Sequence, residues 1–278
     1  MAAGWSPAAV TSVRIALAAV LLAVVVAILR PNALRFRRAD LWLLLSYGLL
    51  GVAGVQLFFF VAVDRVPVGV AMVLVNLAPA LVALWTRFVR RTRLHAVVWL
   101  GITLAVAGLA LVAEVWHSTR LDVLGVTAGL AAALCSAAYF LLGEHGAARH
   151  DSSGLTAAGL TIGAVVTLTI SPPWTVQAAF TAPATLGGLR IPVWLVLLVL
   201  AVAGTALPYL AGLHALRVLP SARASVLALA EPLIAAALAW LLLGQALGPA
   251  QLAGALILLT GAILVQLAPG TTRGPRGR

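Results

Sequence analysis

Lysine is absent from this chain, so all 18 of its Lys/Arg positions are arginines. A P-loop needs a lysine to hold the phosphates of its nucleotide, so the chain contains no P-loop ATPase. A Schiff base to retinal or pyridoxal phosphate also needs a lysine. We therefore expect no lysine-anchored cofactor, and any transport carried out by the chain should not be driven by ATP hydrolysis within it.

Cysteine is almost absent too, and the motifs of common enzymes are missing. The single cysteine, Cys135, lies in an apolar segment, so no intrachain disulfide can form. The chain has no G-x-S-x-G, H-E-x-x-H or C-x-x-C motif, and we expect neither an enzyme nor a metal or cofactor site. Glu144-His145 and His150-Asp151 together resemble a metal site, but they lack regular ligand spacing, and we interpret them as a solvated loop.

Charged residues make up only 9% of the chain, whereas apolar residues make up 63%. A stretch of about 20 apolar residues is long enough to cross the hydrocarbon core of a bilayer as a helix. The sequence predicts nine such helices, at about 9–30, 41–63, 67–86, 95–115, 122–142, 154–171, 191–213, 221–243 and 249–268. The expected fold is therefore an all-α polytopic membrane protein embedded in the lipid bilayer.

The net charge of +11 is explained better by membrane orientation than by nucleic acid binding, and we expect no nucleic acid partner. If the loop at 30–40 is cytoplasmic, fourteen arginines lie on that side: 30, 35, 37, 38, 87, 90, 91, 93, 149, 217, 223, 273, 276 and 278. Three lie on the other side, at 65, 120 and 190. This bias predicts a cytoplasmic C-terminus in the bacterial inner membrane.

Two parts of the chain have glycines and prolines at the same spacing, with a constant offset between the two parts. Gly51, Pro67, Pro79, Gly101 and Gly108 recur 153 residues later, as Gly204, Pro220, Pro232, Gly254 and Gly261. A shared offset over about sixty residues indicates a duplicated unit. Five apolar segments separate one copy from the next, and because five is odd the two copies must cross the membrane in opposite directions. Inverted repeats of this kind are typical of secondary transporters.

The repeat predicts three regions: a first copy at 1–116, a second copy at 121–268, and a disordered basic tail at 269–278. The second copy holds five helices but the first only four. We therefore expect a leading helix to be missing, and an in-frame hydrophobic segment of about 20 codons to lie upstream. A chain that truly has nine helices is the alternative.

One carboxylate lies near the middle of an expected helix, where a charge costs roughly 2.5–3.5 kcal/mol. Glu231 could carry a coupling proton or bind an amine, or it could be a structural carboxyl.

Pro232 follows Glu231, and Pro79 occupies the position equivalent to Pro232 in the first copy. Proline cannot donate to the carbonyl four residues earlier, so each helix should be kinked with a free carbonyl. Asn76 adds an amide at similar depth. The kinks could form a substrate site or be purely structural.

Gln56 and Tyr209 also occupy equivalent positions in the two copies. Two polar groups at such positions could line a central pathway, or they could bond between helices. The expected central cavity lies among the helices at 41–63, 67–86, 191–213 and 221–243. Arg14 is near the start of its apolar segment, and we expect its side chain to extend to the outer membrane surface.

Several of these motifs together resemble the drug/metabolite transporter superfamily, in its EamA-type branch. They are Arg65 to Ala71, Asn76 to Pro79, Leu219 to Ser221, Leu229 to Pro232, and Trp240 to Leu247 followed by Gly254 and Gly261. The resemblance implies ten helices in two inverted units of five, with both ends cytoplasmic. It also differs in one respect: the family often has Gly-Glu after the fourth and ninth helices, whereas this chain has Arg91-Thr92 and Gly244-Gln245.

The resemblance is suggestive of amino-acid exporters around Pro67 to Pro79 and Glu231-Pro232. Together with the repeat, it predicts an exporter of small metabolites, amino acids or amphipathic organic ions that works by alternating access, with protons as the candidate coupling ion because of Glu231. Two alternatives stay open, a membrane scaffold or receptor without transport and a lipid-linked sugar flippase of the same superfamily. The sequence leaves the substrate, the coupling ion and the oligomeric state undetermined.

Overall fold

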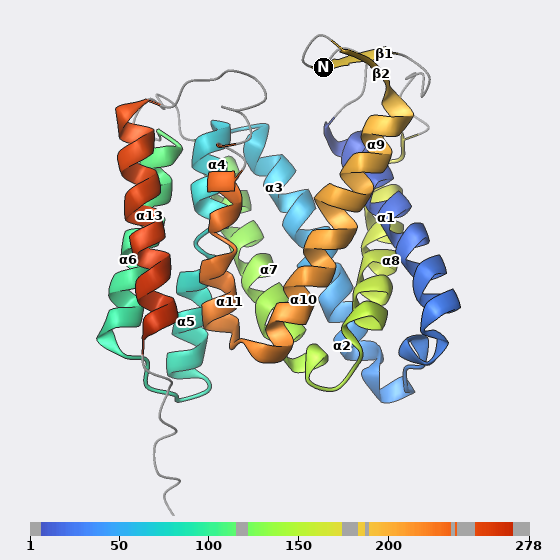
Figure 1. The fold of residues 1–278 in the computed structure, drawn as a ribbon, viewed down its shortest axis with the longest axis horizontal. Coiled ribbons are helices and arrows are strands. Elements are labelled where there is room, and N and C mark those ends of the chain that lie inside the picture. Colours follow the sequence, from blue (N-terminus) through green and yellow to red (C-terminus); the bar gives the residue numbers. More distant parts are fainter. Residues whose placement is uncertain are drawn as a thin grey trace, which may run out of the picture. The chain divides into compact units, whose positions relative to one another are not determined.

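The computed structural model describes residues 7–114, 122–173, 183–186, 189–234, 237 and 248–268. The chain folds into two compact units, each of which combines segments from both halves of the sequence. Unit 1 contains Met1–Phe60 and Leu141–Val218. Unit 2 contains Val61–Phe140 and Leu219–Arg278. Each unit is described here by itself (Figure 1).

Unit 1 consists of helices with one short β-ribbon. Its elements are α1 (Pro7–Leu29), η1 (Pro31–Leu34), η2 (Arg38–Asp40), α2 (Leu41–Ser46), η3 (Tyr47–Gly54), most of α3 (Val55–Val63), α8 (Ser152–Ile170), β1 (Pro183–Leu186), β2 (Leu189–Pro192), α9 (Val193–Ala201), η6 (Val202–Ala206) and α10 (Leu207–Val218). The two strands are antiparallel, with Pro183 opposite Pro192. This ribbon was not predicted, although the Gly187-Gly188 pair between the strands is a hairpin signal.

The regular elements among the described residues of unit 2 are all helices. Its elements are α4 (Val68–Val75), α5 (Ala78–Phe88), α6 (Ala96–Val112), most of α7 (Val123–Ala147), α11 (Ser221–Leu227) and α13 (Pro249–Leu267). The end of α7 belongs to unit 1. Glu144 and His145 lie in this last part of α7, so the prediction of a solvated loop there was wrong.

The described residues contain seven helical spans that are long and apolar enough to cross a membrane. The 17-residue helix α6 is an additional, shorter apolar helix, and the remaining predicted span, at 221–243, begins at α11. The observed spans agree with the predicted ones to within about five residues. The second half of the span at 221–243 and the basic tail lie outside the described residues.

Many alanines are buried in each unit, and many large apolar side chains are exposed on its surface. On α1, Ala18 and Ala19 are buried, whereas Ile28 and Leu29 are more than two-thirds exposed, at 72% and 73%. In a soluble protein this exposure would be costly, but in lipid it is not, because the hydrocarbon is as apolar as the side chains. The pattern therefore fits helices packed through close backbone contact within a membrane.

Helix α8 shows why its small residues are needed. A Cβ atom added at Gly159 would collide with the ring of Tyr47, which is fully buried. A Cβ atom added at Gly163 would collide with the side chain of Val52. Gly159 and Gly163 have the G-x-x-x-G spacing that is typical of close helix packing in membranes, and the two glycines allow α8 to lie against η3.

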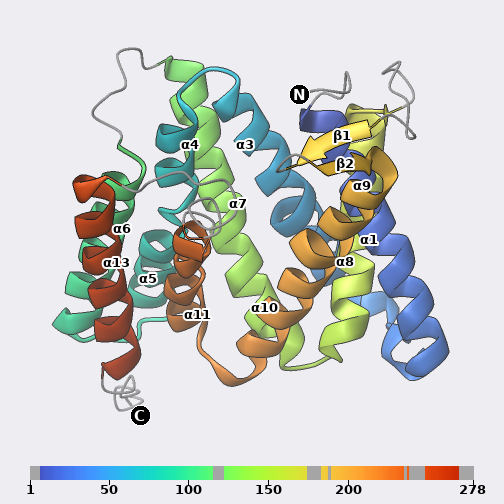
Figure 2. The ribbon, with the colours of Figure 1, turned by 45° about the horizontal axis from the view of Figure 1, so that its top comes forward.

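Helices α6 and α13 of unit 2 are equivalent elements of the repeat, and they pack against each other (Figures 1 and 2). A Cβ atom added at Gly101 would lie 2.7 Å from the Gly261 carbonyl oxygen, and one added at Gly108 would lie 2.6 Å from that of Gly254. The two helices are therefore antiparallel. Equivalent helices run in opposite directions here, as the predicted inversion requires.

Candidate functional site

The six candidate residues are divided between the two units. Gln56 and Tyr209 belong to unit 1, and the other four belong to unit 2: Asn76, Pro79, Glu231 and Pro232. Within unit 1, Gln56 and the Gly51 carbonyl that Tyr209 bonds lie on the same η3–α3 helix, whereas none of the hydrogen bonds of the described residues joins the two proline regions of unit 2.

In unit 1, both candidate residues follow a rare π-helical segment. Gln56 lies just after η3, which covers Tyr47–Gly54, and Tyr209 lies just after η6, which covers Val202–Ala206. Moving η6 back by the 153-residue offset gives 49–53, inside η3, so the π-helix itself is repeated. Turns of this kind are uncommon and occur frequently at functional sites. In η6 the hydroxyl of Thr205 donates to the carbonyl of Leu200 at 3.1 Å.

The side chains of Gln56 and Tyr209 are both involved in bonds around the η3–α3 helix. The Tyr209 hydroxyl donates to the Gly51 carbonyl oxygen at 3.4 Å. The Oε1 atom of Gln56 accepts a hydrogen bond from Nη2 of Arg14 at 3.3 Å. Gly51 and Gln56 are five residues apart, about 7.5 Å along a regular helix. Through these two hydrogen bonds, α10 and α1 are therefore both bonded to neighbouring turns of the η3–α3 helix.

Arg14 was expected to extend to the membrane surface, and that prediction was wrong. Its bond to Gln56 crosses 42 residues of sequence and is partly buried, and its Nε atom is buried. The sequence predicted how far along its helix Arg14 lies, but not the direction in which its side chain points. The available signal was a charged residue inside an apolar run, which is a candidate functional site by default.

In unit 2, the first proline lies where a helix is interrupted. Helix α4 ends at Val75 and α5 begins at Ala78, so Pro79 is near the start of a new helix. The Asn76 side-chain amide donates to the carbonyl of Met72 at 2.8 Å, which closes the end of α4. Asn76 is half-buried and Pro79 is buried. The interruption expected from the sequence is confirmed.

The second proline lies at a matching interruption. Helix α11 ends at Leu227, and the helix resumes at Ala230 just before Glu231 and Pro232. The backbone N–H of Glu231 donates to the Ala228 carbonyl at 3.0 Å, in the tighter i→i+3 pattern. The prediction of a free carbonyl at Ala228 was therefore wrong, since the preceding residue replaces the donor that proline lacks.

The Glu231 side chain is exposed, whereas Pro232 beside it is buried. Glu231 lies in the predicted span at 221–243, of which the structure describes mainly the first part. A charge in the hydrocarbon would cost roughly 2.5–3.5 kcal/mol, so ionisable groups within spans usually face the interior of a helix bundle or a water-filled space.

The loop end of unit 1 carries a polar network. Nε2 of His150 lies 3.3 Å from Oδ1 of Asp40, and the rings of His150 and Phe36 are 5.4 Å apart. Nη1 of Arg30 lies 3.4 Å from Oδ2 of Asp151. These contacts tie the loop after α1 to the loop before α8. His150 and Asp151 lie in a loop, as predicted, but they are half-buried and take part in these contacts.

Asp151 also caps the N-terminus of α8. One carboxylate oxygen accepts hydrogen bonds from the backbone N–H and the hydroxyl of Ser153. The Ser153 hydroxyl has the largest effect and holds the pKa of Asp151 below its ordinary value, with help from Arg30, while burial acts in the opposite direction. The carboxylate is thus a structural cap that stays ionised well into the acid range.

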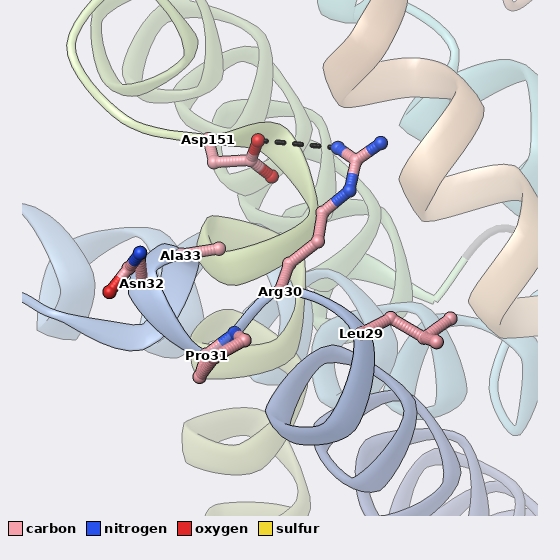
Figure 3. Close-up of a pocket in the computed structure, with 6 residues that line it drawn as sticks. All are labelled: Leu29, Arg30, Pro31, Asn32, Ala33 and Asp151. Carbon is pink, nitrogen blue, oxygen red and sulfur yellow. Dashed lines mark hydrogen bonds and ion pairs between the residues drawn. The ribbon is translucent and has the colours of Figure 1, made fainter.

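Two hollows are present in the described residues. The first, of about 400 Å³, lies at the loop end of unit 1 around the exposed Arg30–Asp151 pair (Figure 3). The second, of about 350 Å³, lies between α11 and α13 and is lined mainly by apolar side chains such as Leu227, Leu259 and Ile263. The second hollow suits an acyl chain better than a polar solute. No group of three or more His, Cys, Asp or Glu that could hold a metal occurs in the part of the chain that the structure describes.

Comparisons with known proteins agree on one family. Residues 1–113 and 123–267 match the EamA-like transporter family. The threonine/homoserine exporters RhtA of Salmonella typhimurium SL1344 and Escherichia coli K12 are 32% and 31% identical over 247 residues, or 87% of this chain and 76% of each relative. An uncharacterized inner membrane transporter, YicL of Salmonella typhimurium LT2, is 27% identical over 83% of this chain and 74% of its own.

A solved structure shares the fold. A crystal structure of a protein aligns with a TM-score of 0.75 and 18% identity, over 94% of this chain and 88% of that chain. The helical spans, the inverted pair α6 and α13, and the two matched regions are features of a multi-pass membrane transport protein. The chain belongs to the EamA-like transporter family, within the drug/metabolite transporter superfamily.

Proposed function

We propose that this protein is a secondary active transporter that exports small metabolites, amino acids foremost, by alternating access coupled to protons. The observation that carries the proposal is the exposed carboxylate of Glu231, located beside an interrupted helix inside a membrane span. A carboxyl in such a position can take up a proton on one side of the membrane and release it on the other. The names of the threonine/homoserine exporters support amino acids as the substrate class.

The charges within the spans support a small zwitterionic substrate. Away from their ends, the described spans carry one arginine, Arg14, and the predicted span at 221–243 adds one carboxylate, Glu231. The candidate residues Gln56, Asn76 and Tyr209 have neutral polar side chains. A multiply charged solute such as a sugar phosphate would need several cations. We therefore assign Gln56, Tyr209, Asn76, Pro79, Glu231 and Pro232 to the substrate pathway or to coupling.

The paired helix interruptions support alternating access. Helices interrupted near the middle of the membrane, in two inverted copies, are a recurring feature of secondary transporters. The two breaks before Pro79 and Pro232 and the two π-helical segments give each copy places where the backbone can bend. We further propose that the protein lies in the inner membrane with a cytoplasmic C-terminus, and that 1–116 and 121–268 are its two repeats.

A lipid flippase is the second candidate, and one observation favours it. The apolar hollow between α11 and α13 has exposed side chains on both helices, as lateral entry of an acyl chain would require. The hollow contains one polar side chain, Gln266, whose amide donates to the Arg223 carbonyl at 3.1 Å. A headgroup would find few partners there, so export of a small solute is the better-supported function.

The test is solute flux in proteoliposomes that contain the purified protein. We expect an imposed pH gradient to drive radiolabelled threonine or homoserine across the membrane, and a protonophore to abolish that flux. Headgroup-labelled lipid in the same vesicles should keep its distribution between leaflets. Redistribution of lipid without any amino-acid flux would support the flippase, and binding of a protein partner without either flux would support a scaffold.

A further inference from the structure

Three exposed arginines lie close together at the loop end of unit 1. Arg35, Arg37 and Arg38 fall within four positions of the segment between η1 and α2, and we call them the basic patch. The apolar helix α1 ends at Leu29, which is 73% exposed, and α2 begins at Leu41. The basic patch therefore lies in the short connection between two membrane spans, at the level of the lipid headgroups.

The aspartates at this end of unit 1 are engaged by other groups. Oδ2 of Asp40 accepts a hydrogen bond from the backbone N–H of Arg37 at 2.9 Å, and Oδ1 of Asp40 lies 3.3 Å from Nε2 of His150. Asp151 pairs with Arg30, at 3.4 Å between Oδ2 and Nη1 (Figure 3). In the parts of the chain that the structure describes, no carboxylate pairs with a guanidinium of the basic patch. Its three positive charges are thus available to an outside partner.

The backbone that carries the basic patch is held in place. The backbone N–H of Asp40 donates to the Arg37 carbonyl at 2.9 Å, so the backbone and the carboxylate of Asp40 close the same turn. The ring of Phe36 lies 5.4 Å from the ring of His150. The turn is therefore fixed against the loop before α8, while the arginines of the basic patch stay exposed. A partner that binds such a preorganised surface loses less free energy to ordering.

Membrane orientation alone does not explain this arrangement. The orientation signal counts arginines near the ends of spans and depends little on acidic residues. It therefore gives no reason for three arginines that lack a carboxylate partner beside an exposed aromatic side chain. Trp42, four residues after Arg38, is 79% exposed. Tryptophan is enriched where hydrocarbon meets headgroups, so the segment presents cations and an indole to the same layer of the bilayer.

We propose that the basic patch binds the headgroup of an anionic phospholipid, whose acyl chains extend past Trp42 into the bilayer. A guanidinium binds phosphate oxygens in a bidentate arrangement, and clusters of arginines next to a membrane span attract anionic lipids. In a zwitterionic lipid the positive headgroup amine offsets the phosphate charge, so the basic patch should distinguish the two kinds of lipid. The acyl chains keep the phosphate at this level, which favours a lipid over phosphate dissolved in water. The inference is independent of the proposed function, because it makes no use of the transported solute.

The experiment measures which lipids surround Trp42 in reconstituted bilayers. Phosphatidylcholine vesicles contain the protein and a small fraction of phosphatidylglycerol, with bromine in the upper acyl chains of one lipid or the other, and bromine quenches indole fluorescence on contact. The difference between each protein and its W42F variant isolates the signal of Trp42. We expect a relative binding constant that favours phosphatidylglycerol by at least about fivefold, the effect of one arginine near an anionic surface. Added salt should lower this preference, because the basic patch is exposed.

The triple variant R35Q/R37Q/R38Q should lose the preference for phosphatidylglycerol. R30Q is the matched control, since it removes a neighbouring exposed charge that already pairs with Asp151, and it should change the preference by less than about twofold. Equal quenching by both lipids in the wild type, or a full preference in the folded triple variant, would overturn the inference. Loss of the preference on addition of millimolar inorganic phosphate would also overturn it, because it would indicate a site for a soluble anion. Should the triple variant not fold, the single variants R35Q and R38Q decide instead, and each should lower the preference.

Discussion

At the scale of single residues, carboxylates occur in two settings. Glu231 is exposed within the predicted span at 221–243, while most other acidic residues among those described lie at helix ends or in loops. At the loop end of unit 1, Asp151 forms an ion pair with Arg30, and Oδ1 of Asp40 lies 3.3 Å from Nε2 of His150. The role of Glu231 and the roles of the carboxylates at the loop end are therefore tested by different substitutions.

We predict that Glu231→Gln abolishes proton-driven export, because glutamine keeps the size and polarity of the side chain but cannot exchange a proton. Gradient-driven flux should fall at least about tenfold, the size of effect expected when proton transfer is lost. Solute exchange without a pH gradient should decrease less. The measurement is labelled threonine flux in proteoliposomes with and without a gradient. Glu144→Gln, at the end of α7, is the control variant, and it should keep its transport activity. Undiminished gradient-driven flux in Glu231→Gln would contradict the coupling hypothesis.

The sequence predicted some of these residues well and others poorly. The helix interruptions at Pro79 and Pro232 could be predicted, because proline acts on its own helix. The direction of Arg14 could not, because it depends on Gln56, which is 42 residues away and belongs to a different helix. The Ala228 carbonyl was likewise mispredicted, since local tightening of the helix supplied a donor from Glu231.

At the scale of secondary-structure elements, the glycines of α6 and α13 set how closely two backbones approach. A Cβ atom added at Gly254 would lie 2.7 Å from the Gly108 carbonyl oxygen and 2.8 Å from the Val112 nitrogen. Backbone atoms cannot rotate away, so the helices must separate. The same addition at Gly204 meets only the flexible end of Leu200, at 3.7 Å.

We predict that Gly254→Ala destabilises the protein by about 1–3 kcal/mol, the usual cost of overpacking, and that Gly254→Val is worse. Gly204→Ala should leave the melting temperature nearly unchanged. Thermal unfolding in detergent, followed by the fluorescence of a thiol-reactive dye on the buried Cys135, measures both variants. Equal melting temperatures for the two alanine variants would contradict the close contact of α6 and α13.

A second element-scale prediction concerns the cap of α8. Asp151→Ala should lower stability by about 1 kcal/mol, the typical cost of losing an N-cap, while Asp151→Asn should retain most of it. Because the folded-state pKa of Asp151 is lowered, the carboxylate stabilises the protein above its unfolded pKa, and this contribution disappears as the pH falls through the folded pKa. The melting-temperature gap between wild type and Asp151→Ala, measured from pH 7 downward, should therefore hold to about pH 4 and then close.

The helices themselves could be predicted from apolar length alone, but the details within them could not. The π-helical turns of η3 and η6 follow no pattern that composition or apolar length predicts. The ribbon of β1 and β2 did leave a mark in its glycine pair, and was missed because the surrounding connection reads as a loop.

At the scale of the whole molecule, the distribution of arginine predicts which loops face the cytoplasm. In a variant in which Cys135 is replaced by serine, single cysteines at Asn32 and Arg91 should react with a membrane-impermeant maleimide only after permeabilisation. A cysteine at the exposed Asp64 should react in intact cells. The physical basis is that arginine-rich loops stay on the cytoplasmic side during insertion. Labelling of all three positions from one side would contradict the inverted arrangement.

The duplication could be predicted from spacing, and the antiparallel contact of α6 and α13 agrees with it. The grouping into compact units could not, because each unit combines helices from both copies. A repeat shows which helices are equivalent, but it does not show which helices become neighbours. Those neighbours are selected by small residues that meet, such as Gly108 and Gly254.

The crossing of α6 and α13 has the form of a two-fold symmetric contact. Gly101 meets Gly261 and Gly108 meets Gly254, so each glycine touches the counterpart of the other. Two separate copies of a half-length chain, inserted in opposite orientations, would associate through this same self-complementary surface. A glycine change in such a pair would alter two contacts at once, whereas in the joined chain each position can vary alone.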